Sequence, residues 1–404
     1  MSFEKLGDIC DVIDSLHKTP KYSDIGKPMV RCTDVKYGEL NLSNTFKVSD
    51  EVFNEFSKRY NPEVNDIIIT RVGSYGITAQ VKDINFCLGQ NTSAIKPKNI
   101  NPDYLYLVLN SKVVKDQIEF SVVGSTQKTL SLKAINNLDI PRFGDEIENQ
   151  IAIIGASLDD KIVNNAQTNQ TLEQMAQAIF KSWFVDFDPV KAKMNGEQPE
   201  GMDAATASLF PEKLVESELG LIPEGWGVGE LSKLFELHRG FDLPKSKRQD
   251  GEYPVYAAGG YHGTHNEFKM EPPGIITGRS GVIGNVYLSL DKYWPLNTTL
   301  YVREFRACGP YYAYHLLRSL DLKSLNSGSA VPSLNRNFVH STNVCHPDSD
   351  VLAKFEEIVT PLFEKMVANN EQNKSLSELR DTLLPKLLSG EIELGQTEEM
   401  AEVS

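Results

Sequence analysis

The chain has 404 residues, which is long enough for two or three domains with proper cores. Its hydrophobic content of 40% and aromatic content of 9% fit a soluble globular protein. The net charge of −14 argues against a nucleic-acid binder, but −6 of it falls between Asp186 and Trp226 and −5 follows Gly390. Since only −3 remains for the rest of the chain, a basic face elsewhere is not excluded.

The N-terminal sequence MSFEKLGDICDVIDSL has no basic region followed by an apolar run, and no long uncharged apolar stretch follows later. Neither a signal peptide nor a membrane span is therefore predicted, and a cytoplasmic location is expected. The cysteines are scattered, odd in number and lack close pairs, which argues for reduced thiols and against a disulfide framework or a zinc site. They are Cys10, Cys32, Cys87, Cys308 and Cys345.

Residues 1–144 have the pattern of a mixed α and β domain. Alternating or continuous apolar runs bounded by Gly, Asn and Pro predict strands at Asp66–Thr70, Val81–Leu88 and Ala94–Lys96. A helix is predicted over Asp103–Phe120, with Asn101 as its cap and Pro102 in its first turn.

The next stretch, 150–183, has apolar residues at steps of three and four, which is typical of one stripe on a long coiled-coil helix. The same pattern recurs at 354–387, and identical residues are separated by a constant offset of 204. The matched pairs are Lys161 and Lys365, Val163 and Val367, Asn165 and Asn369, Asn169 and Asn373, and Leu172 and Leu376. A common offset without gaps indicates a duplicated unit of about half the chain.

Both copies place Asn and Gln between their apolar blocks. Buried amides penalise wrong registers, so the two helices are predicted to pair with each other in one fixed alignment. Two ordinary amphipathic helices on separate cores would explain the periodicity but not a length of roughly 35 residues, about 50 Å. Pro361 predicts either a kink in the second helix or its true start.

Between the two copies, 186–226 is rich in Pro, Gly and acids and marks a boundary between halves. The mixed pattern restarts at Gly227, with a helix predicted over Gly309–Leu320. Strands are predicted at Gly274–Thr277, Val286–Leu290 and Thr299–Val302.

The duplication extends into these globular parts. Residues 71–76 and 279–284 share the pattern Arg-x-Gly-x-x-Gly, each soon after an Ile-Ile-Thr segment. Asn91-Thr92-Ser93 corresponds to Asn297-Thr298-Thr299, and Gly124-Ser125 corresponds to Gly328-Ser329. The glycines are interpreted as turn residues with positive φ, and the two asparagines as caps rather than base readers. Elsewhere the two halves differ, which suits two modules that share a scaffold and recognise different things.

Three long segments carry a resemblance that covers essentially the whole chain. They are NQTLEQMAQAIFKSWFVDFDPVKAKM at 169–194, LFPEKLVESELGLIPEGW at 209–226 and LRDTLLPKLLSGEI at 379–392. In this order they resemble the specificity subunit of type I restriction-modification systems. The resemblance implies an α+β fold, with two duplicated mixed α/β target recognition domains separated by two long helices that form an antiparallel coiled coil.

The domain boundaries expected on this basis follow the pattern changes along the chain. They are 1–145 for target recognition domain 1, 146–185 for the central long helix, 186–226 for the acidic linker, 227–349 for target recognition domain 2, 350–391 for the C-terminal long helix and 392–404 for the acidic tail.

The resemblance also implies a function. Each target recognition domain would read one half of a split, asymmetric site in double-stranded DNA, and the helices would set the distance between them. The chain would bind two modification subunits, which use S-adenosylmethionine to methylate adenine, and restriction subunits, which are motor nucleases. No cofactor and no catalytic residue is expected in this chain itself.

Candidate DNA contacts are polar and basic residues on the Gly-rich turns. Arg71 and Arg279 are predicted to grip a phosphate or to read guanine by two hydrogen bonds. Further candidates are Ser74, Tyr75, Ser125, Thr126, Gln127 and Lys128 in the first module, and Lys245, Lys247, Arg248, Ser280, Asn335 and Arg336 in the second. For each of them a turn-forming or solvated side chain is the competing interpretation.

Two other classes of protein remain open. A self-sufficient DNA methyltransferase or nuclease is disfavoured, because Asn101-Pro102-Asp103-Tyr104 has Asp in place of the second Pro of Asn-Pro-Pro-Tyr. The Arg-x-Gly-x-x-Gly pattern lacks the first glycine of a dinucleotide fingerprint. The histidines lack the neighbours of a metal motif. The second alternative is a coiled-coil protein-interaction scaffold without sequence-specific DNA readout.

Overall fold

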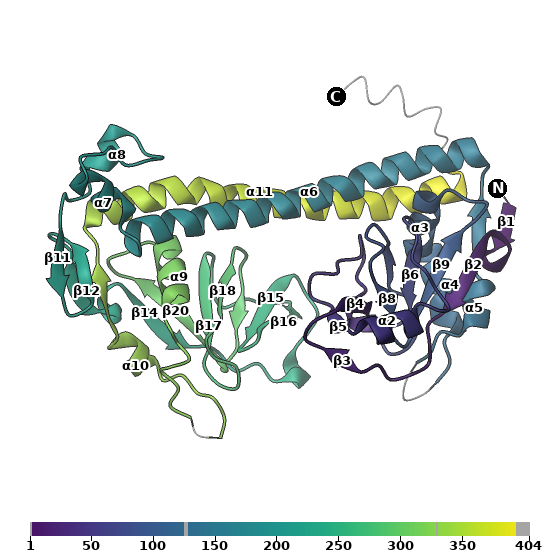
Figure 1. Cartoon of the computed structure of the whole chain (residues 1–404), viewed down its shortest axis with the longest axis horizontal. Coiled ribbons are helices and arrows are strands. Elements are labelled where there is room, and N and C mark those ends of the chain that lie inside the picture. The colour runs from purple at the N-terminus through teal and green to yellow at the C-terminus, as the bar shows by residue number, and fades with distance from the viewer. Residues whose placement is uncertain (1, 125–127, 329, 393–404) are drawn as a thin grey trace. The chain divides into compact units, whose positions relative to one another are not determined.

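The computed structural model describes residues 2–124, 128–328 and 330–392. It divides into two compact units, a terminal unit formed by residues 1–165 and 371–404 and a middle unit formed by residues 166–370. Two long helices, α6 (Asp145–Phe184) and α11 (Ser349–Ser389), lie side by side and antiparallel, and each contributes residues to both units (Figure 1). The predicted fold class is thus confirmed.

The terminal unit is built on an antiparallel four-stranded sheet with the order β2 (Cys10–Asp14), β9 (Thr92–Pro97), β6 (Ile67–Thr70) and β7 (Thr78–Gln80). A second sheet has the order β3 (Tyr22–Ser23), β5 (Phe46–Val48), β4 (Lys27–Val30) and β8 (Cys87–Leu88), and β1 (Ser2–Lys5) pairs with β10 (Asp139–Arg142). The short helices are α1 (Leu6–Ile9), η1 (Cys32–Asp34), α2 (Asp50–Phe56), α3 (Pro102–Asn110), α4 (Lys112–Ser121) and α5 (Leu132–Asn136).

The middle unit repeats this plan. Its antiparallel sheet has the order β14 (Phe235–Arg239), β20 (Thr299–Phe305), β17 (Gly274–Gly278) and β18 (Val286–Ser289). The other sheets join β16 (Gly260–His265), β15 (Tyr253–Ala257) and β19 (Trp294–Pro295), then β13 (Gly227–Glu230) and β21 (Asn343–His346), then β11 (Leu214–Ser217) and β12 (Gly220–Pro223). The short helices are α7 (Asp188–Met194), α8 (Ala204–Ser208), η2 (Leu231–Lys233), η3 (Lys245–Lys247), α9 (Pro310–Ser319) and α10 (Arg336–His340).

The registers of the two main sheets match at the strand ends that lead into the turns; farther back, β14 has a bulge between Glu236 and Leu237 that β2 lacks. In the terminal unit Ser93 of β9 lies between Asp14 and Ile69. In the middle unit Leu300 of β20 lies between Arg239 and Thr277. Asp14 and Arg239 therefore occupy equivalent positions, although the first is an acid and the second a base. The chain duplication is a duplication of structure, since the same strand neighbours recur. The correspondence of Ser93 with Thr299 drawn from the sequence is wrong by one residue, because the register makes Ser93 equivalent to Leu300.

Sequence reasoning was wrong about two elements of the terminal unit. The strand expected over Val81–Leu88 is limited to β8, because Asp83 accepts a hydrogen bond from the Asn85 N–H at 2.8 Å and turns the chain. The helix expected over Asp103–Phe120 is two helices, α3 and α4, because the backbone at Ser111 is extended. The predicted cap is confirmed, since the Asn101 side chain accepts from the N–H groups of Asp103 and Tyr104.

In each unit the long helices bury apolar residues against the module. Between these apolar stretches the two helices pair through amide side chains. In the terminal unit Asn165 donates to the Asn373 side chain at 2.8 Å. In the middle unit Asn369 donates to the Asn169 side chain at 2.8 Å. The offset of 204 relates Asn165 to Asn369 and Asn169 to Asn373, so the two pairs occupy corresponding positions of the duplicated helices. The amides therefore meet only when the helices are aligned in this register. Helix α11 begins at Ser349 and continues through Pro361, which therefore does not mark its start.

All five cysteines are free, in agreement with the scattered pattern of the sequence. Within the described residues, no helix has both the length and the apolar character that crossing a membrane requires.

Candidate nucleic-acid interface

The Arg-x-Gly-x-x-Gly segments form equivalent turns at the ends of equivalent strands. Residues 71–77 connect β6 to β7, and residues 279–285 connect β17 to β18. The four glycines have φ between 72° and 96°, which confirms their interpretation as turn residues. They are Gly73, Gly76, Gly281 and Gly284. Each turn also makes the same backbone hydrogen bond. Arg71 O accepts from Leu130 N and Arg279 O accepts from Leu334 N, both at 2.8 Å.

Although the two turns share this backbone arrangement, their arginine side chains have different partners. The side chain of Arg71 is bound by residues of its own module. Its guanidinium donates to the Asp14 carboxylate through Nη1 and to Leu130 O through Nε at 3.0 Å. The side chains of Arg71 and Asp14 are only 11% and 14% exposed. Burial opposes ionisation of Asp14, but hydrogen bonds from Arg71 and His17 outweigh it and lower the pKa of the carboxyl group. Arg71 and Asp14 thus form a nearly neutral, half-buried pair.

Tyr75 and Lys128 are joined by a carboxylate of α4. Lys128 Nζ lies 2.6 Å from Glu119 Oε1 and 3.1 Å from the Tyr75 hydroxyl, which itself donates to Glu119 Oε2 at 2.6 Å. Hydrogen bonds from Lys128 and Tyr75 lower the pKa of Glu119. Ser74 lies on the same turn and is exposed. The candidates Ser125, Thr126 and Gln127 lie outside the described residues.

Arg279 is held differently. Its Nε donates to Asn297 O at 3.0 Å, and no described carboxylate forms an ion pair with it. Burial lowers the pKa of the guanidinium, and the nearby charge of Arg239 lowers it further. Asn297 also donates through Nδ2 to Asp242, which lies 3.7 Å from Arg239.

The remaining candidates of the middle unit are largely solvated. Arg248 donates to His262 O at 2.8 Å, and Asn335 accepts from the Asn337 N–H at 2.9 Å as the cap of α10. Ser280 is half-buried on the turn. Lys245 and Lys247 are exposed on η3 and Arg336 is exposed on α10. No ion pair with a described carboxylate is formed by these three cations or by Arg248.

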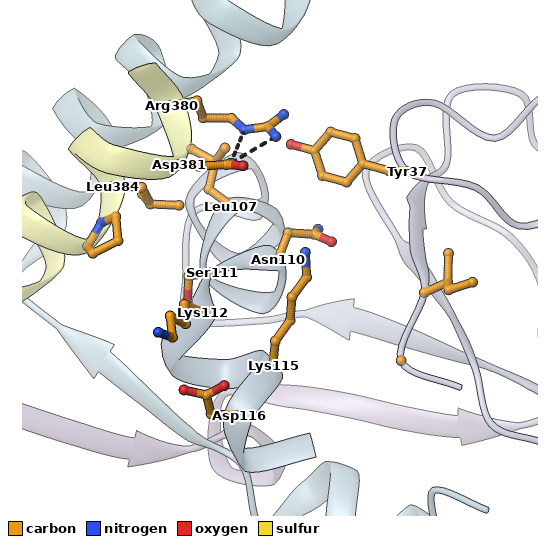
Figure 2. Close-up of a pocket in the computed structure, with 13 residues that line it drawn as sticks. Tyr37, Leu107, Asn110, Ser111, Lys112, Lys115, Asp116, Arg380, Asp381 and Leu384 are labelled. Carbon is orange, nitrogen blue, oxygen red and sulfur yellow. Dashed lines mark hydrogen bonds and ion pairs between the residues drawn. The ribbon is translucent and has the colours of Figure 1, made fainter. Parts of the chain in front are cut away.

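A cavity of about 740 Å³ lies behind the first turn, within the terminal unit (Figure 2). Gly76 and Ile77 of the turn and Arg380 of α11 are among the residues that line it. Arg380 is bound to Asp159 at 2.8 Å and lies over the Tyr37 ring at 4.8 Å. The cavity is also lined by Lys112 and Lys115, which form no ion pair with a described carboxylate. Their side chains are drawn beside Asn110 and Asp116 in Figure 2.

Sequence reasoning missed the residues that decide the charge of the two turns, namely Asp14, Glu119 and Arg239. Asp14 lies on β2 and reaches Arg71 only through the register of three strands. Within the described residues, no group of three or more His, Cys, Asp and Glu side chains is placed to hold a metal ion.

Fold and turns together define a class of protein: a duplicated pair of mixed α/β modules joined by two antiparallel helices. The family model described as "Type I restriction modification DNA specificity domain" matches residues 1–174 and 223–376. The match covers well over half of the chain, which therefore belongs to this family.

Individual relatives agree with this assignment. The type I restriction enzyme HindI specificity subunit of Haemophilus influenzae is 28% identical over 76% of this chain and 82% of its own length. The MjaIX specificity subunit of Methanocaldococcus jannaschii is 24% identical over 89% of this chain and 83% of its own length. The fold is similar to the crystal structure of the type I restriction-modification system S subunit from M. genitalium, with a TM-score of 0.50, 19% identity and 96% and 95% of the two chains covered.

Proposed function

We propose that this chain is the non-catalytic specificity subunit of a type I restriction-modification complex. It reads a split, asymmetric site in double-stranded DNA, one half-site with each module. It also holds the methyltransferase and restriction subunits on the DNA.

One observation carries this proposal: two modules of the same fold present equivalent turns with different side chains. Arg71 and Arg279 have the same backbone surroundings but different partners, and Asp14 is replaced by Arg239 at the equivalent position. A scaffold that is kept while its exposed groups diverge suits two readers of different base sequences, because base readout depends on side chains at the groove.

The pair of long helices supports the spacing part of the proposal. A 40-residue helix such as α6 is about 60 Å long. Half-sites on one face of B-DNA lie about 34 Å apart, one helical turn, so helices of this length are sufficient to hold two readers at that separation. The same helices would receive the methyltransferase subunits, which would bring S-adenosylmethionine and all of the methyl-transfer chemistry.

The test is co-purification of the full chain with the modification subunits of its own host, followed by single-molecule sequencing of DNA that the complex has methylated. The expected result is a split motif with methylated adenine on both strands. The matched control is the same preparation without this chain, which should leave the motif unmethylated.

Three outcomes would overturn the proposal. A continuous motif would contradict the two-module reading. A stable complex that methylates nothing and ignores DNA would favour the alternative, a coiled-coil interaction scaffold. Methyl transfer by the purified chain alone would contradict its non-catalytic role.

A further inference from the structure

The two modules differ in the charge that they place at the base of the Arg-x-Gly-x-x-Gly turn. Arg71 and Arg279 follow equivalent strands, and the last residues of β2 and β14 occupy equivalent positions beside them; in the terminal unit that residue binds Arg71 directly, and in the middle unit its charge acts on Arg279. That residue is Asp14 in the terminal unit and Arg239 in the middle unit, both in register with the same position of the neighbouring strand. The same site therefore holds an arginine with an acid in one module and two arginines in the other.

At the turn of the terminal unit the positive charge of the candidate contacts is already neutralised. Asp14 forms an ion pair with Arg71, and Glu119 forms one with Lys128 at 2.6 Å. Both described cations among the candidate contacts of this module thus have a carboxylate partner. A phosphate group that approached them would have to displace a carboxylate, and the net gain would be small.

In the middle unit the acidic residue next to this site, Asp242, is largely exposed to solvent. Asp242, three residues after Arg239, is 72% exposed, accepts from Asn297 and lies 3.7 Å from Arg239. The ordinary limit for an N–H···O hydrogen bond is about 3.2 Å, so this pairing is loose. Asn297 connects the group, since its carbonyl oxygen accepts from Arg279 Nε and its amide donates to Asp242. The Nη atoms of Arg279 have no hydrogen bond to a described residue.

Two guanidinium groups near one another repel, and the repulsion is relieved when a dianion or a phosphodiester lies between them. The planar fork of arginine matches the oxygens of a phosphate in two parallel hydrogen bonds. Contacts of this kind fix the position of a protein on DNA without reading its sequence.

We propose that Arg239 and Arg279 form a binding site for one phosphate of the DNA backbone, and that the equivalent Asp14–Arg71 site of the first module does not. The inference rests on the proposed function. It makes the two turns unequal: the one in the second module holds a phosphate of the DNA backbone, whereas the equivalent one in the first module does not.

The test measures the affinity of the full chain, in complex with its methyltransferase subunits, for a fluorescein-labelled duplex at several salt concentrations. Each phosphate contact contributes about 0.9 to the slope of log affinity against log salt. Arg239→Gln and Arg279→Gln should therefore each lower the slope by about 0.9. Between about 50 and 200 mM salt, each variant should lose about 3.5-fold less affinity than the unmodified complex does.

A second variant, Arg239→Asp, reproduces the arrangement of the first module and should lower the slope in the same way, because Arg279 then gains a carboxylate partner while the fold stays intact. Lys292→Gln is the matched control, because it removes a cation of the same module that is already paired with Glu271 at 3.2 Å. Its slope should equal that of the unmodified complex.

The inference is overturned if Arg239→Gln and Arg239→Asp keep the full slope with an unchanged melting temperature, or if Lys292→Gln lowers it equally. A complex that binds the duplex at no salt concentration would instead overturn the proposed function, and the inference with it.

Discussion

A single arginine has different roles in the two modules. Arg71→Ala should destabilise the terminal unit, because it removes the only ion-pair partner with a permanent charge that the half-buried Asp14 carboxylate has among the described residues, leaving it with His17 and the Ser93 hydroxyl, and because it leaves Leu130 O without its guanidinium donor. An unpaired buried group of this kind costs about 1–3 kcal/mol. Arg279→Ala leaves no carboxylate without a partner among the described residues. It should therefore lower the stability less and should act mainly on DNA binding. Thermal unfolding of both variants checks this, and equal melting temperatures would contradict it.

His315 makes the middle unit sensitive to acid. It is 2% exposed on α9, stacks on Phe180 at 5.4 Å, and its Nε2 has no partner among the described residues. Burial, and then the charge of Arg318, lowers its pKa from 6.5 to about 4. Because the unfolded chain binds the proton more readily, stability is fully present above pH 6.5 and is lost as pH falls toward 4.

The test is His315→Leu, which installs the residue found at the equivalent position of α3, Leu107. Relative to the unmodified chain, its free energy of unfolding should rise by about 2 kcal/mol between pH 7 and pH 5. Glu356 is the control of opposite sign, since burial raises its pKa to about 7 and its contribution is lost as pH rises. Glu356→Gln should therefore gain relative stability as pH rises. A pH-independent effect of His315→Leu would refute the assignment.

At the scale of elements, the amide pairs of the long helices should behave as units. Asn165 is 5% exposed and donates to both Gln372 and Asn373. Asn165→Leu alone leaves the Asn373 side chain facing an apolar group and should cost about 1–3 kcal/mol. The double variant with Asn373→Leu should recover most of this loss. Chemical denaturation of the single and double variants gives the coupling, and additive losses would contradict it.

The sequence was sufficient to predict elements that are specified by a local residue pattern. It was insufficient to predict features that depend on contacts with residues far along the chain. The stripe at steps of three and four, repeated at one offset, predicted both long helices and their pairing. The glycine spacing predicted the two turns. Ser111 interrupts a helix without a Gly or Pro, so the break between α3 and α4 left no local signal.

The candidate contacts show the same division. Their positions on turns followed from the motif, but their availability depends on partners far along the chain. Arg71 is predicted to grip a phosphate or to read guanine, and the structure adds a partner for it, Asp14, which lies 57 residues away in the sequence. Only the register of β2, β9 and β6 brings the two together, and no spacing rule contains that register.

At the scale of the whole molecule, the helix pair is predicted to set the gap between half-sites. Removing one turn, about four residues or 6 Å, from both helices together should shorten the gap by about two base pairs. The bases of each half-site should stay the same, because the modules are untouched. Methylation mapping of the shortened complex measures both quantities. A constant gap would show that the helices do not set the spacing.

The order in which the chain leaves the ribosome follows from how the units divide the helices. The middle unit is one continuous segment, residues 166–370, and is complete as soon as that segment has emerged. The core of the terminal unit includes Leu384, Leu387 and Leu388, which are synthesised after the whole of the middle unit. The module that is translated first therefore cannot close its core until the second module has been synthesised, and the second module holds all of its own residues before the first does.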